Sequence, residues 1–174
     1  MPAVAEKTLV NTFNPDSPKV QQQIKRFTGP FLRFGLLYKL PMAWFMGLKV
    51  KSLTPYKAEA TIPYGWRSQN PFRSIYFIAQ AGAAEFPSGM LALLAITDRG
   101  CDISLLVSKV ESEFTKKATA LTTFTCEDGL LIQETVQKAI DTGEAQACTV
   151  TSIGKMPNGE IVSTHKLTWS FKVR

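Results

Sequence analysis

The sequence has few side chains that bind metals or act as nucleophiles. It holds a single histidine, His165, and three cysteines, Cys101, Cys126 and Cys148, which lie far apart in the chain. Such wide spacings exclude a zinc knuckle and a dithiol redox motif, and three cysteines do not make a disulfide framework. We therefore expect no metal site, and we expect reduced thiols in a cytoplasmic protein. The position of His165 in a strand-like segment favours a half-buried structural role.

Long hydrophobic runs are also missing. Arg33, Lys39 and Pro41 interrupt the most apolar stretch, residues 31–48, so no transmembrane helix of roughly 20 residues is expected there. The N-terminus has no basic start followed by an apolar run, so we expect no signal peptide. With 174 residues, of which 45% are hydrophobic and 20% charged, the chain is typical of one globular domain.

Acidic residues are scarce in the first third of the chain. Residues 1–60 carry nine Lys or Arg and three acids, which accounts for the whole net charge of +6, whereas the rest of the chain carries eleven of each sign. This distribution predicts attraction to an anion. Residues 25–51 interleave basic and aromatic side chains, as nucleic-acid-binding segments do, but their apolar excess favours packing onto the sheet or onto lipid. We therefore expect no nucleic-acid partner.

The N-terminal part is predicted to be helical. We expect a flexible arm over residues 1–16 and a single domain over residues 17–174, of which residues 17–47 form a helical extension. One helix opens at Ser17-Pro18 and runs to about residue 26, and a second covers residues 31–38. From residue 56 to residue 64 apolar and polar side chains alternate, which predicts a half-buried strand that starts near residue 48.

The rest of the chain predicts a sheet around one buried helix. Residues 74–96 are rich in Ala and Leu on every face, so we expect a buried helix with a break or kink near Phe86, caused by Pro87 and Gly89. Residues 130–140 predict either a short amphipathic helix or an extension of the preceding strand. Four strands are predicted, over residues 103–114, 118–127, 145–153 and 161–173. The last two are joined by a hairpin at Asn158-Gly159. This order favours an α+β fold with the sheet wrapped around the helix.

Glu85 is the residue that most needs an explanation. It is the only charged residue between Arg73 and Asp98, and an ionised carboxylate in an Ala-rich helix is costly unless it is paired or used in chemistry. A position at a subunit interface, or an ion pair with a nearby arginine, would account for it without catalysis.

The loop before this helix carries a motif. Residues 70–76 are Asn-Pro-Phe-Arg-Ser-Ile-Tyr, and Glu85 follows Tyr76 by nine positions. This arrangement resembles hotdog-fold acyl-CoA thioesterases, whose loop Asn-x-x-Gly-Ser-x-His precedes a buried central helix with an acidic residue nine positions past the His. With the upstream segments RFTGPFLRF and LPMAWFMGLKVKSLTP, the chain is similar to a poorly characterised bacterial branch of these thioesterases, a domain of unknown function, over roughly residues 20–173.

The resemblance implies a hotdog fold and hydrolysis of acyl-CoA thioesters. Glu85, supplied across a dimer interface in this family, would act as general base on water or as nucleophile on the acyl carbon. The N–H of Phe77 matches the family's oxyanion donor at the helix N-terminus, and Asn70 would orient the water or the carbonyl. Ser74 matches the Ser of the motif, and Gln80 is a further polar candidate near the same groove.

Three positions depart from the family's loop. Arg73 stands where the motif has Gly, Tyr76 where it has His, and Phe77 where a Gly often follows the His. The imidazole acid or base is therefore absent. Its absence tells against the sister dehydratases of the fold, which pair a His with the acid.

The resemblance also implies partners. Coenzyme A enters only as part of the substrate, so no separate cofactor is expected. Its phosphates would meet Arg67, Arg73, Lys116 and Lys117, for each of which solvated surface charge is the alternative. We expect the apolar residues between 27 and 48 to cover an acyl pocket, and a homodimer formed by sheet pairing, or a dimer of dimers.

Two other functions stay open at this point. One is a catalytically silent hotdog module that binds acyl-CoA or fatty acyl chains. The other is a peripheral membrane-binding protein led by residues 17–51, in which a lipid surface rather than CoA supplies the anions.

Overall fold

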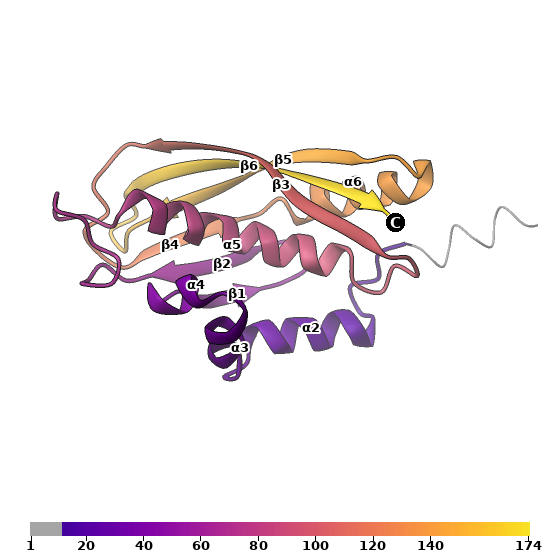
Figure 1. Ribbon diagram of the computed structural model, residues 1–174, viewed down its shortest axis with the longest axis horizontal. Helices are drawn as coiled ribbons and strands as arrows, with labels where there is room; N and C mark the ends of the chain where they lie inside the picture. The colour runs from indigo at the N-terminus through magenta and orange to yellow at the C-terminus, as the bar shows by residue number, and fades with distance from the viewer. Residues whose placement is uncertain (1–11) are drawn as a thin grey trace, which may run out of the picture.

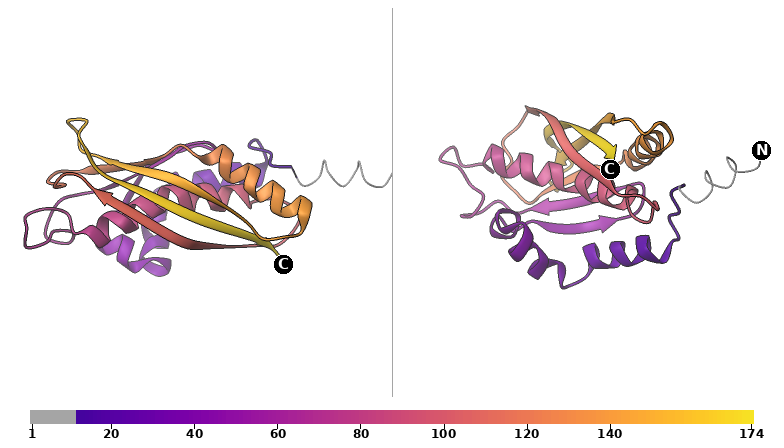
Figure 2. Two further views of the ribbon diagram at one scale, coloured as in Figure 1. Left: turned by 90° about the horizontal axis from the view of Figure 1, so that it is seen from above. Right: turned by 45° about the vertical axis from the view of Figure 1, so that its right-hand side comes forward.

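A computed structural model describes residues 12–174, so residues 1–11 of the predicted N-terminal arm lie outside the described residues. A six-stranded antiparallel sheet curves around one long helix, α5 (Figure 1 and Figure 2). The strand order is β1-β2-β4-β5-β6-β3, so β1 and β3 form the two edges. The strands are β1 Lys49–Leu53, β2 Ala58–Ile62, β3 Ile103–Phe114, β4 Thr122–Cys126, β5 Gln146–Lys155 and β6 Ile161–Val173. The predicted α+β architecture is confirmed.

Within residues 12–174, three helices precede the sheet: α2 Pro18–Thr28, α3 Leu32–Lys39 and α4 Pro41–Phe45. Proline opens α2 and α4, because its fixed φ suits a helix start and the N–H it lacks would have no intrahelical acceptor there. Helix α2 packs against β1 and α5 and buries Val20 completely. The two predicted helices are thus present, and α4 is an additional one.

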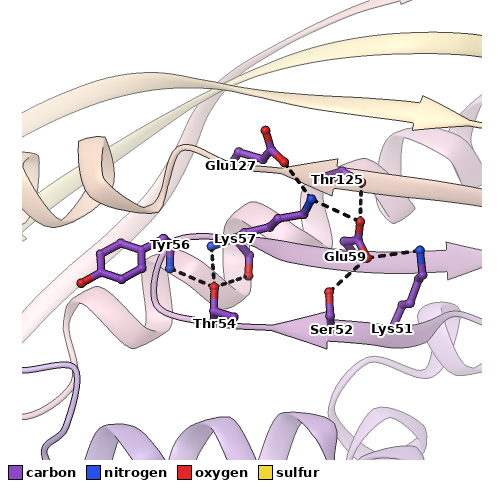
Figure 3. Close-up of polar contacts among 8 residues, drawn as sticks. All are labelled: Lys51, Ser52, Thr54, Tyr56, Lys57, Glu59, Thr125 and Glu127. Carbon is purple, nitrogen blue, oxygen red and sulfur yellow. Dashed lines mark hydrogen bonds and ion pairs between the residues drawn. The ribbon is translucent and has the colours of Figure 1, made fainter.

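The single strand predicted over residues 48–64 is wrong. The structure has a hairpin here, in which β1 and β2 pair from Lys49 opposite Thr61 to Leu53 opposite Ala58. The chain turns at Thr54, whose hydroxyl oxygen accepts the backbone N–H groups of residues 56 (3.3 Å) and 57 (3.0 Å) (Figure 3). Pro55 follows and has no N–H to give to a strand ladder, so the local chemistry favours a turn over a continuous strand.

The face of β1, β2 and β4 that points away from α5 carries an ion-pair network centred on Glu59 (Figure 3). Lys51 and Lys57 lie 3.2 and 3.6 Å from its carboxylate oxygens, and Ser52 and Thr125 donate hydrogen bonds to it. Burial acts to raise the pKa of Glu59, but the hydrogen bonds from Lys51 and Ser52 and the two ammonium charges outweigh burial and lower that pKa. Lys57 also lies 2.8 Å from Glu127, so two cations of the basic first third are already paired with two carboxylates.

Helix α5, Phe77–Ala95, is the core helix of the domain. It runs through Pro87 without interruption, so of the break or kink predicted near Phe86, the break is absent. Pro87 removes one backbone hydrogen bond, but packing of α5 against β2, β4, β5 and β6 holds the helix through that point. Among the described helices, only α5 is long and apolar enough to cross a membrane, and 67% of its apolar 18-residue window is buried inside the domain, as expected of a core helix.

The second half of the chain builds the far side of the sheet. Strands β5 and β6 form the predicted hairpin, with Gly159 at a φ of 84° in its turn, a conformation that glycine adopts without strain. Residues Gly129–Thr142 form helix α6, which decides between the two alternatives for this segment. Strand β3 pairs with β6 on one side only, so within residues 12–174 its outer edge has no partner strand.

Candidate functional site

The loop before α5 is organised by the side chain of Asn70. Its Oδ1 accepts hydrogen bonds from the backbone N–H groups of Phe72 (3.0 Å) and Ser74 (3.2 Å) and from the Ser74 hydroxyl (3.3 Å). The Asn70 N–H also donates to the Ser74 carbonyl oxygen at 2.9 Å. Asn70 and Ser74 therefore shape the loop, and within residues 12–174 the Asn70 Nδ2 has no hydrogen-bond partner.

Arg73 adopts a left-handed backbone, with a φ of 60°. This is the position at which the thioesterase loop motif has glycine, the one residue that takes this conformation without a Cβ clash. The Arg73 side chain is exposed. The loop therefore keeps the backbone shape that a glycine would suit, although the sequence has an arginine there.

Arg73→Gly is expected to raise the free energy of unfolding by about 0.5–1 kcal/mol, because glycine removes the strain of the left-handed backbone. Urea denaturation at pH 7 measures this. Arg67→Gly is the matched control, since Arg67 is also exposed but has a negative φ, so glycine there lowers stability by about 0.5–1 kcal/mol. Equal destabilisation by both substitutions would contradict strain at Arg73.

The N-terminus of α5 presents free backbone donors. Tyr76 precedes the helix with an extended backbone and no side chain caps the helix, so the N–H of Phe77 is among the first donors without an intrahelical acceptor. These donors and the helix dipole favour an oxyanion at this end. Beside them lies a cavity of about 350 Å³, here called the loop cavity, lined by Asn70, Ser74, Ile75, Phe77, Gln80, Phe114, Thr115, Lys116 and Lys117. Six predicted site residues are thus brought together, namely Asn70, Ser74, Phe77, Gln80, Lys116 and Lys117.

Tyr76, in the place of the family's His, does not line the loop cavity. Its ring packs edge-on against Phe77, with centroids 5.0 Å apart, and Phe77 packs in the same way against Phe114 at 6.3 Å. Tyr76 and Phe77 are 41% and 53% exposed. An aromatic row therefore stands where the family has an imidazole and a glycine.

Gln80 is buried, and both ends of its amide are used inside the protein. Its Nε2 donates to the Ile75 carbonyl oxygen (3.0 Å), and its Oε1 accepts from the Ser163 hydroxyl (3.1 Å). The Ser163 oxygen also lies 3.0 Å from Nε2 of His165, whose Nδ1 is 2.8 Å from the Ser112 hydroxyl oxygen. Gln80 therefore ties the loop to β6 through Ser163, and both its Nε2 and its Oε1 already make a hydrogen bond inside the protein.

His165 belongs to this network and is completely buried, so the predicted half-buried position is wrong. Residues Phe114 and Phe124 pack edge-on against its ring, with centroids 5.5 and 5.8 Å away. Burial lowers the pKa of His165 to about 4, which makes the ring neutral at pH 7. Its role is structural, as the sequence indicated.

Glu85 lies elsewhere, halfway along α5. It lines a groove of about 790 Å³ between α5 and helices α2 and α3, here called the Glu85 groove. This volume is within the roughly 300–1,000 Å³ of small-molecule sites. Most of the lining is apolar and consists of Phe27, Phe31, Leu32, Leu36, Leu40, Phe86, Met90 and Leu93. Three cations also line the groove, namely Lys25, Arg26 and Lys39. The apolar residues after position 27 thus cover a groove beside the one carboxylate of α5.

The Glu85 carboxylate has no partner in the described chain. Within residues 12–174 its side chain makes no hydrogen bond and no ion pair, so the arginine pairing offered as an alternative is not present there. Burial raises the pKa of Glu85. A Cβ on Gly89 would lie 2.9 Å from Glu85 Oε1, so this glycine leaves the space that the carboxylate occupies. An unpaired, half-buried carboxylate costs stability unless function retains it.

The loop cavity and the Glu85 groove are separate within one chain. Glu85 lies eight positions after Phe77 on α5, which at the helical rise is about 12 Å along the axis. A general base and an oxyanion donor for one carbonyl must both lie within hydrogen-bond reach of the reacting atoms, roughly 3 Å. One copy of the chain therefore presents two halves of the arrangement that the motif implies.

The four basic residues expected near the loop do not gather in one place. Lys116 pairs with Glu160 at 2.9 Å, and the Lys117 ammonium donates to the Phe72 carbonyl oxygen at 3.2 Å. Arg67 lines a third groove, between α2, α3 and β1, and the exposed Arg73 does not line the loop cavity.

The chain matches a family model over most of its length. That model, described as a domain of unknown function, DUF4442, matches residues 31–171. The chain belongs to the DUF4442 family. No curated protein matches this DUF4442 chain.

Solved structures show what this DUF4442 chain looks like. A probable thioesterase from Pseudomonas aeruginosa is similar with a TM-score of 0.70 at 19% identity, over 84% of this chain and 97% of that one. A thioesterase from Haemophilus influenzae has a TM-score of 0.59 at 14% identity, over 84% and 92%. A thioesterase family protein from Silicibacter pomeroyi has a TM-score of 0.59 at 15% identity, over 89% of this chain and 99% of that one. At such identities the likeness shows the fold, and it confirms the predicted hotdog fold.

Sequence reasoning missed the residues of α2 that line the groove of this DUF4442 domain. Gln23, Lys25 and Arg26 line the Glu85 groove, yet they lie far from Glu85 in the chain. The helical spacing of α2 indicated an amphipathic helix, but no local signal indicated that its partner is the Glu85 face of α5.

Proposed function

We propose that this protein hydrolyses acyl-CoA thioesters at sites shared by two copies of the chain. The observation that carries the proposal is Glu85, an unpaired carboxylate in the wall of an apolar groove with cations along it. The acyl chain would lie along the apolar residues of α3 and α5. The phosphates of coenzyme A would meet Lys25, Arg26 and Lys39, which lie on the same groove.

The second half of each site would be the helix N-terminus of the other copy. The separation of Phe77 and Glu85 along α5, about 12 Å, keeps the pair from acting on one carbonyl within a chain. The free N–H of Phe77, with Asn70 Nδ2 nearby in the same loop cavity, would bind the carbonyl oxygen. Glu85 of the facing chain would reach the carbon from the other side.

Strand β3 is the edge through which two copies would pair. Its outer backbone groups have no partner within residues 12–174, and an open edge of this length favours pairing with another strand. Leu106, Val110 and Phe114 on it are 66%, 50% and 42% exposed. A two-fold dimer would pair the two edges and cover these side chains. Phe114 also contacts Phe77, so the pairing would bring the loop cavity to the interface.

Mixing two inactive variants tests whether each site is shared. Asn70→Ala removes the oxygen that holds the loop together, and Glu85→Gln removes the base. If each site takes its loop from one copy and its carboxylate from the other, a mixed dimer has one intact site. Random re-pairing should then restore roughly one quarter of wild-type activity. No recovery in verified mixed dimers would place both groups within one chain.

The reaction needs no group beyond these residues and water. The ionised Glu85 takes a proton from water, and the water oxygen bonds to the thioester carbon. The carbonyl oxygen gains the negative charge and is held by the N–H of Phe77. The C–S bond then breaks, and the thiolate takes the proton from Glu85, which leaves a carboxylic acid and free CoA. If Glu85 attacks directly, water opens the resulting anhydride, and this route also needs the ionised carboxylate.

The test is turnover of an acyl-CoA panel from acetyl to palmitoyl, followed by release of the CoA thiol. We expect turnover that rises with chain length until the groove is filled. Binding of acyl-CoA without turnover at any chain length would contradict hydrolysis and favour the silent binding module. The aromatic Tyr76 and Phe77 at the N-terminus of α5 are also compatible with such a module. Neither binding nor turnover would contradict both.

A further inference from the structure

Helices α3 and α4, with the neighbouring Trp66, expose many large apolar side chains. The two helices contact each other, and Trp66 packs edge-on against Phe45 with centroids 6.1 Å apart. Eight large apolar side chains here are 44–82% exposed: Phe31, Phe34, Leu37, Tyr38, Leu40, Met42, Phe45 and Trp66. We call these residues the α3–α4 surface. Apolar patches of this kind mark interaction sites, because exposing them to water is costly.

The α3–α4 surface lies away from the edge proposed for dimer pairing. Helix α2, which leads into α3, contacts β1, and β1 and β3 are opposite edges of the sheet. In Figure 1, α3 lies below α5 and β1, whereas β3 lies above α5. Pairing through β3 would therefore leave the α3–α4 surface uncovered.

The cations around this surface lack acidic counterparts. Residues 17–58 contain eight Lys or Arg and no Asp or Glu. Three of the eight are paired with acids from other segments: Lys19, Lys51 and Lys57. The other five are exposed and have no carboxylate within ion-pair distance in residues 12–174: Lys25, Arg26, Arg33, Lys39 and Lys49. The unpaired positive charge is thus concentrated on α2, α3 and the start of β1.

Two of these cations lie directly beside exposed or half-buried rings. The Arg33 guanidinium is 5.9 Å from the Trp44 ring centroid, and the Lys39 ammonium is 5.3 Å from that of Tyr38. Aromatic rings and cations in this arrangement suit the boundary between lipid headgroups and acyl chains, where the ring enters the apolar layer and the cation meets phosphate.

We propose that the α3–α4 surface binds an anionic lipid bilayer. Phe31, Phe34, Tyr38 and Met42 enter the headgroup boundary, and the unpaired cations of α2 and α3 meet the lipid phosphates. Charge decides between this partner and a second copy of the chain. A two-fold contact would bring the same cations of both copies together without any acid between them, which repels.

The Glu85 groove opens at the same surface, since Phe31, Lys39 and Leu40 line the groove and are also exposed. A protein bound in this way would open the Glu85 groove toward the bilayer, which is the source of long acyl chains. This consequence rests on the proposed function, whereas binding to the bilayer does not. Failure of acyl-CoA turnover would leave the bilayer proposal standing, and the reverse also holds.

The test is sedimentation of the full chain with phosphatidylcholine vesicles prepared either with phosphatidylglycerol as the minor lipid or without it. We expect binding to the anionic vesicles that weakens as NaCl is raised from about 50 to about 500 mM. Phe34→Ser/Tyr38→Ser/Met42→Ser is expected to weaken binding at least roughly ten-fold, because it removes the inserted apolar area. Arg33→Gln/Lys39→Gln is expected to weaken binding to the anionic vesicles toward the level seen with neutral vesicles, because two of the five unpaired cations are lost.

Leu130→Ser/Leu131→Ser on α6 is the matched control, because these side chains are 56% and 40% exposed outside the α3–α4 surface. It should bind vesicles like the wild type. All variants are checked for an unchanged thermal transition, which exposed substitutions should preserve. Wild-type protein that sediments with neither vesicle would overturn the proposal. A triple variant that binds vesicles like the wild type would also overturn it. The same holds if the triple variant binds less only because its oligomeric mass, measured without lipid, is lower than that of the wild type.

Discussion

Glu85→Gln is expected to lower kcat/KM for acyl-CoA at least roughly 100-fold, because the amide cannot take a proton from water or attack the acyl carbon. The variant should fold as well as the wild type or better, since it replaces an unpaired, partly buried carboxylate with a neutral group of the same shape. Initial rates of thiol release and urea denaturation measure the two effects. Glu134→Gln on the exposed side of α6 is the matched control and should change neither.

The pH profile of the wild type gives a second check on Glu85. Burial raises the pKa of this carboxyl above its usual value, so the ionised form that the reaction needs is lost at a higher pH than for an exposed glutamate. We expect kcat/KM to fall as pH drops through that raised pKa. An activity that survives Glu85→Gln with its pH profile unchanged would refute the assigned role.

Acidification from pH 7 to pH 4 is expected to cost about 3 kcal/mol of stability through His165 alone. Burial lowers its pKa from the usual 6.5 to about 4, so between these values the unfolded chain binds a proton that the folded protein excludes. Stability from this group is thus complete above about pH 6.5 and is lost as pH falls toward 4. Urea denaturation at half-unit steps of pH measures the slope.

His165→Gln isolates this contribution from that of the carboxyl groups. The amide keeps donor and acceptor atoms near Ser112 and Ser163, but it does not titrate. We expect the variant to be less stable at pH 7, because the packing of Phe114 and Phe124 against the ring is lost. Its decline toward pH 4 should be about 3 kcal/mol smaller than that of the wild type. An equal decline in both proteins would show that His165 is not the titrating group.

Much of the fold followed from local pattern. The Ala-rich helix, the β5–β6 hairpin and the two N-terminal helices could be predicted because each depends on periodicity or on turn chemistry within a few residues. The β1–β2 hairpin was missed because the alternation over residues 56–64 was extended back to residue 48, across the turn at Thr54. The break at Pro87 was wrong because helix propensity is a local quantity, and burial of α5 overrides it.

The candidate site divides in the same way. Asn70, Ser74 and Phe77 could be predicted together because one short loop and one helix start hold them. Arg73 departs from the motif in its side chain, but its backbone keeps the glycine conformation. The pairing of Lys116 with Glu160 and of Gln80 with Ser163 depends on strands far along the chain, so no spacing could reveal it.

By itself the sequence determined the class of fold, the motif loop and the presence of one carboxylate in an apolar helix, because periodicity and local spacing encode these directly. The tertiary structure alone decided what surrounds that carboxylate. It set α2 and α3 beside Glu85, left Glu85 without a partner in residues 12–174, and placed the helix N-terminus about 12 Å from it. It also decided which of the basic residues in the first third of the chain are paired with acids, since the acids that pair with Lys19, Lys51 and Lys57 come from other segments of the chain. Contacts between distant segments depend on how the elements pack, and local sequence does not record that packing.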